Sequence, residues 1–228
     1  MIYTIVADIF DFNEIYSKRD CHDMWQPLSL IPEDVLEYIE SSRSEKTRLE
    51  RFCAYFTLFL TVERFYKKKN LSISRTEHGK PYLVENGEKS NIHISISHTD
   101  GAIAVAISDE YELGVDLQIN ISEAQEKRLE KRFFDGVKIK NEIIDQEIYR
   151  LTISNNIDFE KICETNVSVS DFTQKWAFCE SVLKCDGKGF LKLSQINELE
   201  EKVLTSVKNI RIQKDIYALA TSIKSAIM

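Results

Sequence analysis

The spacing of hydrophobic residues predicts a strand and a long helix in the first part of the chain. Residues 2–8 (IYTIVAD) are mostly apolar and β-branched, which is typical of a strand. A short helix is expected to begin after Pro32. From about Ser44 to Lys68 the apolar positions recur every three or four residues, which predicts one long amphipathic helix with a buried stripe of Leu49, Phe52, Phe56, Phe59 and Leu60.

A period of two replaces this pattern in the middle of the chain. Residues 92–98 (IHISISH) alternate, so a strand would place the isoleucines on one face and His93, Ser95 and Ser97 on the other. Residues 99–101 (TDG) are a turn signal, and the apolar residues 102–108 predict a returning strand. A further short strand is expected at residues 113–118 (LGVDLQ).

Two more helices are expected in the second half of the chain. A helical pattern runs over residues 122–134, and a stronger one covers residues 172–185. Ser170 precedes the stronger helix as a capping residue, and Gly187 and Gly189 follow it. These signals predict well-defined ends for the later helix.

The remaining segments complete the prediction of the fold class. Residues 135–170 have no clean period, whereas residues 207–212 and 217–223 predict a β-hairpin. Each half of the chain therefore mixes a helix with a few mostly antiparallel strands. The expected fold class is α+β, with two similar halves joined near residues 109–114, although the sequence contains no visible repeat.

Composition and charge exclude several classes of protein. The chain has 228 residues, of which 43% are hydrophobic, and this is enough for a packed core and excludes intrinsic disorder. A formal net charge of −7 argues against a nucleic-acid-binding surface. No apolar run reaches the roughly 18–20 residues that span a bilayer. The beginning of the chain lacks the basic stretch of a secretion signal, so none is expected.

The cysteines and histidines favour a reducing compartment without a zinc site. The five cysteines are an odd number and include no CxxC pair, which is typical of reduced thiols and favours a cytoplasmic location. The four histidines are not spaced with the cysteines as zinc ligands are.

Two segments of the second half carry acids that could do chemistry. In residues 114–118 (GVDLQ), a strand places Asp116 and Gln118 on one face, where an acid can bind a hard cation through oxygen. A solvent-facing aspartate is the commoner explanation of such a residue. In the later helix, one turn separates each of Trp176, Glu180 and Lys184 from the next, although an isolated Glu–Lys pair at this spacing is usually a weak surface pair.

Two earlier segments are equally weak when taken alone. Residues 96–98 (ISH) end the alternating strand beside a turn, where a histidine is usually a hydrogen-bonded surface residue. Residues 78–82 (HGKPY) form a tight turn that presents Lys80, and most lysines in such turns are solvated. The order of all four segments is far more specific than any one of them.

In this order the segments resemble the Sfp-type 4′-phosphopantetheinyl transferase family. The resemblance covers about residues 45–190, and its matched segments are Gly79–Leu83, Ile94–His98, Gly114–Asp116, Arg132–Phe134, Trp176–Lys184 and Gly187–Phe190. It implies a pseudo-dimer of two α+β halves with the active site in the cleft between them. Residues 1–111 would then contact the phosphates of coenzyme A, and residues 112–228 would hold the metal and the catalytic residues.

The resemblance also implies an activity. Enzymes of this family bind coenzyme A and Mg²⁺ and transfer the phosphopantetheine arm to a serine of an apo acyl, peptidyl or aryl carrier protein. The holo carrier, which serves fatty-acid, polyketide or non-ribosomal peptide synthesis, and 3′,5′-ADP are the products. The implied partners are therefore coenzyme A and a carrier protein, and we expect a cytoplasmic monomer that binds neither nucleic acid nor membrane.

The roles of single residues follow from the same resemblance. Asp116 and Glu180 would hold Mg²⁺, and Glu180 would act as general base toward the carrier serine, directly or through a metal-bound water. Lys184 would contact the phosphates and stabilise charge on the leaving ADP. The other expected ligands of coenzyme A are Lys80, Ser97 and His98 for the phosphates, and Arg48 and Arg51 for the nucleotide.

The chain departs from the family pattern at two places. Many members have a third acid where this chain has Gln118, which offers the metal a neutral carbonyl oxygen. The spacing between Asp116 and Glu180 is also longer than usual, because of an insert at residues 135–172. This insert is acidic and would either repel wrong partners or form a variable loop.

The segment before the insert is a candidate docking surface. Residues 123–140 carry a net positive charge, and carrier proteins are typically acidic. The basic residues of this segment are Lys127, Arg128, Lys131, Arg132, Lys138 and Lys140.

A non-catalytic module that binds coenzyme A or a carrier protein on the same fold is the alternative function. Gln118 would then be the sign of lost metal chemistry. A protein that only binds has no reason to retain a base and a cation one helical turn apart. The presence of both Glu180 and Lys184 therefore favours an enzyme.

Overall fold

The computed structural model describes residues 1–17, 29–133, 140–153, 157–188, 196, 199 and 202–224. These residues form a mixed α+β fold. In chain order its elements are β1 (Ile2–Asp8), η1 (Ile9–Phe12), α1 (Asn13–Ser17), α2 (Glu33–Glu40), α3 (Glu45–Tyr66), β2 (Leu71–Arg75), β3 (Pro81–Glu85), β4 (Glu88–Lys89), β5 (His93–Thr99), β6 (Ala102–Ser108), β7 (Leu113–Ile119), α4 (Glu123–Phe133), β8 (Gln146–Ile153), β9 (Ile157–Lys161), α5 (Asp171–Asp186), β10 (Val203–Ile212) and β11 (Asp215–Lys224).

The described strands form three sheets. The largest has the order β5-β6-β1-β8-β9, in which β1 pairs antiparallel with β6 and parallel with β8. The second sheet has the order β10-β11-β7 and is antiparallel throughout. A small antiparallel sheet, β2-β3-β4, packs near β5.

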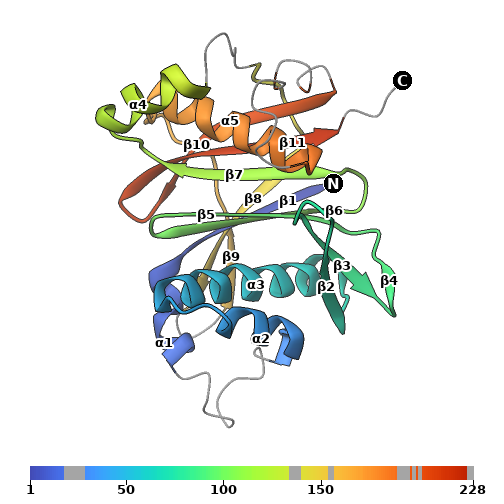
Figure 1. Ribbon diagram of the computed structural model, residues 1–228. Coiled ribbons are helices and arrows are strands. Elements are labelled where there is room, and N and C mark those ends of the chain that lie inside the picture. The colour runs from blue at the N-terminus through green and yellow to red at the C-terminus, as the bar shows by residue number, and fades with distance from the viewer. Residues whose placement is uncertain are drawn as a thin grey trace.

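The two larger sheets lie between the two long helices, as Figure 1 shows. α3 packs on the outer face of the five-stranded sheet around an aromatic core that includes Phe52 and Phe56. On the inner face of that sheet, Val6 and Ala104 share a core with Val115 of the second sheet. α5 covers the outer face of the second sheet. The layers therefore run helix, sheet, sheet, helix, and β5 lies next to β7 where the two sheets meet.

The long helix predicted for this segment is confirmed as α3, but its burial is not confined to one stripe. It begins after Ser44, whose side chain accepts a hydrogen bond from Thr47 N, and it ends at Lys67, which is left-handed with φ 56°. Phe52 and Phe56 are fully buried, whereas Leu49 at the edge of the predicted stripe is half-buried. Every residue from 52 to 62 is buried, because α1 and α2 also pack against this helix.

Most of the other predicted elements are also confirmed. The strands expected at residues 2–8, 92–98, 102–108 and 113–118 are β1, β5, β6 and β7. The hairpin at the end of the described chain is longer at its open end than the pattern predicted, because β10 begins at Val203. Its strands pair in register from there to the turn.

The interpretation of residues 135–172 as a variable loop is wrong for the part that the structure describes. This segment contains β8 and β9, and β8 lies inside the five-stranded sheet. The alternation of β8 is hard to recognise because its apolar residues serve two cores. Ile148 packs between the sheets, whereas Leu151 and Ile153 pack toward α3. The largest sheet therefore takes strands from both sides of the expected boundary between residues 111 and 112.

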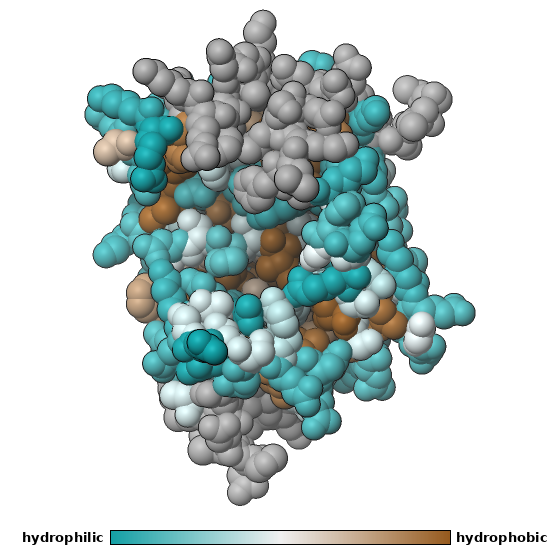
Figure 2. Space-filling view, in the orientation of Figure 1, coloured by the Kyte–Doolittle hydropathy of each residue, from teal (hydrophilic) through white to brown (hydrophobic). Residues whose placement is uncertain are grey.

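Hydrophilic residues cover most of the described surface on the face seen in Figure 2, and hydrophobic residues show mainly in recesses between them. Among the described helices, none combines the length and the apolar composition needed to cross a membrane.

Candidate active site

A glycine allows α5 to lie directly against β7. A Cβ atom on Gly114 would be 2.1 Å from the Ser181 carbonyl oxygen and 2.4 Å from the Cys185 backbone nitrogen. Any larger residue would therefore push the helix away from the strand. Helix α5 begins after Ser170, whose side chain accepts from Thr173 N, and it ends at Gly187 in the left-handed conformation. The predicted ends of this helix at Ser170 and Gly187 are confirmed; Gly189 lies outside the described residues.

Asp116 lies two residues after Gly114, on the same face of β7, and its side chain is buried. Its Oδ1 atom accepts hydrogen bonds from Ser97 Oγ at 2.8 Å and from Lys184 Nζ at 2.7 Å. Its Oδ2 atom is also buried but has no hydrogen-bond partner. One oxygen of this carboxylate is thus held by two donors, while the other lacks the partner that a buried oxygen needs.

Glu180 and Lys184 occupy successive turns of α5 near this carboxylate. Glu180 is only 8% exposed, and burial raises the pKa of its carboxyl to about 7. The nearby charge of Asp116 raises this pKa further, and the charge of Lys184 lowers it. Lys184 Nζ donates to Ser97 Oγ at 2.9 Å in addition to Asp116. The two acids and the lysine therefore form one electrostatically coupled cluster.

This cluster fits a hard divalent cation. Two buried carboxylates repel each other, and a single lysine neutralises only one of them. A cation between them would restore the balance and satisfy Asp116 Oδ2. Mg²⁺ commonly takes only one or two carboxylates, with waters and substrate phosphates in its other positions. In the described ranges no group of three or more His, Cys, Asp and Glu side chains forms a metal site.

Gln118 is on the same strand and half-buried. Its side-chain Nε2 atom donates to the backbone oxygen of Ile119 at 3.1 Å. The amide is therefore anchored locally through its nitrogen. Whether its oxygen would join a metal site stays a prediction.

Lys80 ties the turn before β3 to both elements of the site. Its Nζ atom donates to the backbone oxygens of Leu113 and Cys185, each at 3.1 Å. These carbonyls lie at the start of β7 and near the end of α5. Burial lowers the pKa of the Lys80 ammonium group. The contact of Lys80 with a phosphate remains a prediction. The structure shows its ammonium group bonded to one carbonyl at the start of β7 and one near the end of α5.

A pocket of about 220 Å³ opens beside the cluster. Its wall combines the turn at residues 78–81, the strand β5 and the helix α5. Glu180 and Lys184 both line it, and so does Lys80. A neighbouring pocket of about 290 Å³ shares Lys80 and is rich in charged side chains. Lys80, Glu180 and Lys184 thus face one hollow where the 78–81 turn, β5 and α5 meet, whereas Asp116 lies behind its wall.

Ser97 and His98 have opposite environments although they are adjacent. Ser97 is buried and bonded to Asp116, Lys184 and the backbone nitrogen of Leu117. The side chain of His98 is 59% exposed, and its Nε2 atom lies 3.8 Å from Glu50 Oε2. Alternation along β5 explains the difference, since neighbouring side chains point to opposite faces. His98 therefore lies at the surface beside Glu50, whereas Ser97 belongs to the buried cluster.

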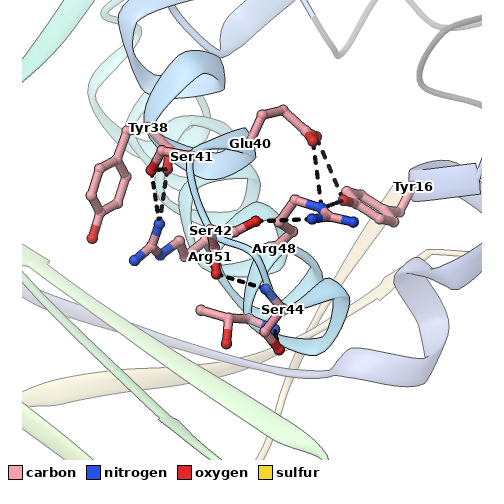
Figure 3. A network of polar contacts seen from close by, with 9 residues as sticks. Tyr16, Tyr38, Glu40, Ser41, Ser42, Ser44, Arg48 and Arg51 are labelled. Carbon is pink, nitrogen blue, oxygen red and sulfur yellow. Dashed lines mark hydrogen bonds and ion pairs between the residues drawn. The ribbon is translucent and has the colours of Figure 1, made fainter.

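Arg48 and Arg51 are engaged at the connection between α2 and α3, as Figure 3 shows. Arg48 donates through its Nη1 atom to the Ser42 oxygen at 2.9 Å and through Nε to Tyr16 Oη at 3.3 Å. Arg51 Nη1 donates to the Tyr38 oxygen at 2.9 Å, and its guanidinium lies 4.2 Å from the centre of the Tyr38 ring. Both side chains hold their own segment together. Their expected role in binding a nucleotide stays a prediction.

Two features of the site are not apparent from the sequence. The first is the docking of β5 on β7, in which Ser95 Oγ accepts from Val115 N at 3.0 Å and Ser97 Oγ accepts from Leu117 N at 3.2 Å. The alternating serines indicate that one face of β5 is polar, but they do not indicate which strand packs against that face. The second is the role of Gly114 in bringing α5 to β7, for which the sequence gives no signal except the glycine itself.

Comparison with known proteins gives one informative similarity. No protein-family model matches the chain. A 111-residue region is 32% identical to a protein of Synechocystis sp. named "Putative 4'-phosphopantetheinyl transferase". The match covers 49% of this chain and 37% of that protein, so the chain spans little more than a third of its relative. This similarity supports, loosely, a relationship of the chain to phosphopantetheinyl transferases.

Proposed function

We propose that this protein transfers the 4′-phosphopantetheine group of coenzyme A to a serine of an apo carrier protein, with Mg²⁺ as cofactor. One observation carries the proposal. Two buried acids from distant parts of the sequence, Asp116 and Glu180, lie close enough for the charge of Asp116 to raise the pKa of Glu180. Lys184 bonds Asp116, and Glu180 and Lys184 both line a pocket. The order of the sequence motifs and the name of the Synechocystis relative point to the same class of enzyme.

The reaction joins a serine oxygen to phosphorus and breaks the pyrophosphate linkage of coenzyme A. The serine proton must leave as the new bond forms, and 3′,5′-ADP departs with the electrons of the broken bond. Glu180 is the proposed base, because its carboxyl lines the pocket in which the substrate would bind. Mg²⁺, held by Asp116 and Glu180, would neutralise charge on the pyrophosphate.

Lys184 and the pocket lining supply the remaining functions in this proposal. The Lys184 ammonium group is half-buried and already bonded to Asp116, so it is in place to stabilise negative charge on phosphates. Lys80 holds β7 and α5 together through their backbone oxygens. His98 is exposed beside Glu50 on the opposite face of β5 from Ser97, so its contact with a phosphate is the part of the proposal with the least support.

The test is intact-mass spectrometry of several apo carrier proteins incubated with this protein, coenzyme A and Mg²⁺. The expected result is a gain of one phosphopantetheine on a single serine of at least one carrier. Glu180→Ala should abolish this gain and leave coenzyme A binding largely intact. Glu88→Ala, which changes an exposed acid of β4, should leave both unchanged.

The opposite outcome is equally clear. Tight binding of coenzyme A without a mass gain on any carrier would contradict the proposal. It would favour the non-catalytic binding module instead. Unchanged turnover in Glu180→Ala would remove Glu180 from the reaction.

A further inference from the structure

The Ser97 hydroxyl has all of its hydrogen-bonding capacity in use. A serine hydroxyl has one hydrogen to donate and two lone pairs to accept with. Two of the partners of Ser97, the Leu117 backbone nitrogen and Lys184 Nζ, are donors only, so the serine accepts from both. Its hydrogen must therefore go to Asp116 Oδ1, at 2.8 Å.

This arrangement fixes the orientation of the Asp116 carboxylate. Oδ1 receives both the Ser97 hydrogen and the Lys184 ammonium group, whereas Oδ2 receives no hydrogen bond. The hydroxyl also holds Leu117, the residue that follows Asp116 in β7. Ser97 thus holds the backbone beside this aspartate and, together with Lys184, engages Oδ1 and leaves Oδ2 free.

We propose that Ser97 is a positioning residue that orients the Asp116 carboxylate for a divalent cation and does not itself bind a phosphate. The inference rests on the proposed function, in which Asp116 and Glu180 hold that cation. It also changes the expected role of Ser97, because a hydroxyl whose only hydrogen is committed to Asp116 has none to offer a phosphate oxygen.

Ser95 provides a matched control on the same strand. It is buried like Ser97, and its hydroxyl accepts a hydrogen bond from the Val115 backbone nitrogen at 3.0 Å. Loss of either hydroxyl removes one contact between β5 and β7. Only the loss of Ser97 also removes a hydrogen bond to a side chain of the acid cluster.

The experiment measures Mn²⁺ binding by titration calorimetry and, separately, coenzyme A binding in metal-free buffer, for the full chain and its variants. In Ser97→Ala the Kd for Mn²⁺ should rise about tenfold or more, the usual effect of losing a hydrogen bond to a metal ligand. In Ser95→Ala it should stay within about twofold of wild type. The affinity for coenzyme A should be the same in all three proteins.

Two results would overturn the inference. Weaker coenzyme A binding with unchanged Mn²⁺ affinity in Ser97→Ala would make Ser97 a phosphate ligand. An equal loss of Mn²⁺ affinity in Ser95→Ala would reduce the effect to the docking of the two strands. If Ser97→Ala does not fold, Ser97→Cys is judged by the same criteria, since a thiol of similar size is only a weak donor.

Failure of the inference can be told apart from failure of the proposed function. A wild-type protein that binds Mn²⁺ and modifies a carrier, but loses no Mn²⁺ affinity in Ser97→Ala or Ser97→Cys, contradicts the inference alone. A wild-type protein that neither binds Mn²⁺ nor modifies any carrier contradicts the proposed function, and the inference with it.

Discussion

Three side chains, Asp116, Glu180 and Lys184, set the electrostatics of the candidate site. When Asp116 and Glu180 are both ionised, their two negative charges exceed the single positive charge of Lys184. The raised pKa of Glu180 is the direct consequence, because burial and the Asp116 charge both favour its neutral form. In the proposed function, a bound divalent cation would remove this excess.

The same excess predicts how stability depends on pH. The folded-state pKa of Glu180, about 7, lies above the ordinary value of 4.5. The folded protein therefore holds this proton more tightly than the unfolded chain, and stability falls as the pH rises from about 4.5 through 7. Glu180→Gln removes the effect. In metal-free buffer the variant should gain stability over wild type between pH 5 and pH 8, by on the order of 3 kcal/mol, since one pKa unit is about 1.4 kcal/mol.

Urea unfolding at pH 5 and pH 8 with a chelator present measures this gain. Glu88→Gln is the control, because this acid is exposed on β4. An equal effect of Glu180→Gln at both pH values would show that Glu180 has an ordinary pKa.

The packing of α5 on β7 is the feature at the scale of elements that creates the site. Neither element carries a complete site: the strand supplies Asp116, and the helix supplies Glu180 and Lys184. Their separation is set by Gly114, where the strand backbone approaches the helix backbone. The distance between the two acids therefore depends on a residue with no side chain.

Replacement of Gly114 by alanine tests this dependence. The added methyl group would lie 2.1 Å from the Ser181 oxygen, so α5 must move or the protein must lose stability. We expect a loss of about 3 kcal/mol in the free energy of unfolding, together with loss of carrier modification. Gly87→Ala is the matched control, because no atom lies within 4 Å of its Cβ position and only the positive φ of 84° is strained. It should cost about 1–2 kcal/mol, and equal losses in the two variants would contradict the packing argument.

The helix α4 is the element proposed to bind the carrier. Lys127 and Arg128 are exposed on it, while Phe134 and Lys138 lie outside the described residues. Charge reversal at Lys127 and Arg128 should raise KM for an acidic carrier several-fold and leave KM for coenzyme A unchanged. Arg64→Glu, on the exposed side of α3, is the control. Equal effects on both substrates would exclude α4 as the docking surface.

At the scale of the whole molecule, β8 connects the later part of the chain to the first sheet. It pairs in parallel with β1, so residues far apart in the sequence share one layer. Leu151 of β8 is fully buried in the core under α3. The part of the acidic segment that forms β8 thus belongs to the framework that supports the site.

Substitution of Leu151 tests whether β8 is a structural part of the core or a dispensable loop. Leu151→Ala should lower the free energy of unfolding by about 2–5 kcal/mol, as expected for a buried leucine. Val167→Ala lies in the same segment but changes a residue that is 49% exposed, and it should cost less than about 0.5 kcal/mol. Thermal or urea unfolding measures both. A Leu151→Ala protein as stable as Val167→Ala would show that β8 does not support the core.

The sequence predicts local features of this molecule better than contacts between distant segments. The alternation in β5, the caps of α5 and the shared face of Asp116 and Gln118 follow from the period of the chain and from short-range hydrogen bonds. The parallel pairing of β8 with β1 cannot be predicted from a turn, because parallel strands are not joined by a tight turn. The bonds from Ser97 to β7 likewise require that two sheets meet, which no local pattern encodes.

The central claim is that Asp116 and Glu180 bind one divalent cation between β7 and α5. The most direct test is the anomalous scattering of a crystal grown with Mn²⁺ and coenzyme A. The account predicts one Mn²⁺ peak within bonding distance of Asp116 Oδ2 and of the Glu180 carboxylate. A peak bound to only one of these acids would contradict it. The absence of a peak at both acids, in a crystal where both stay buried, would contradict it as well.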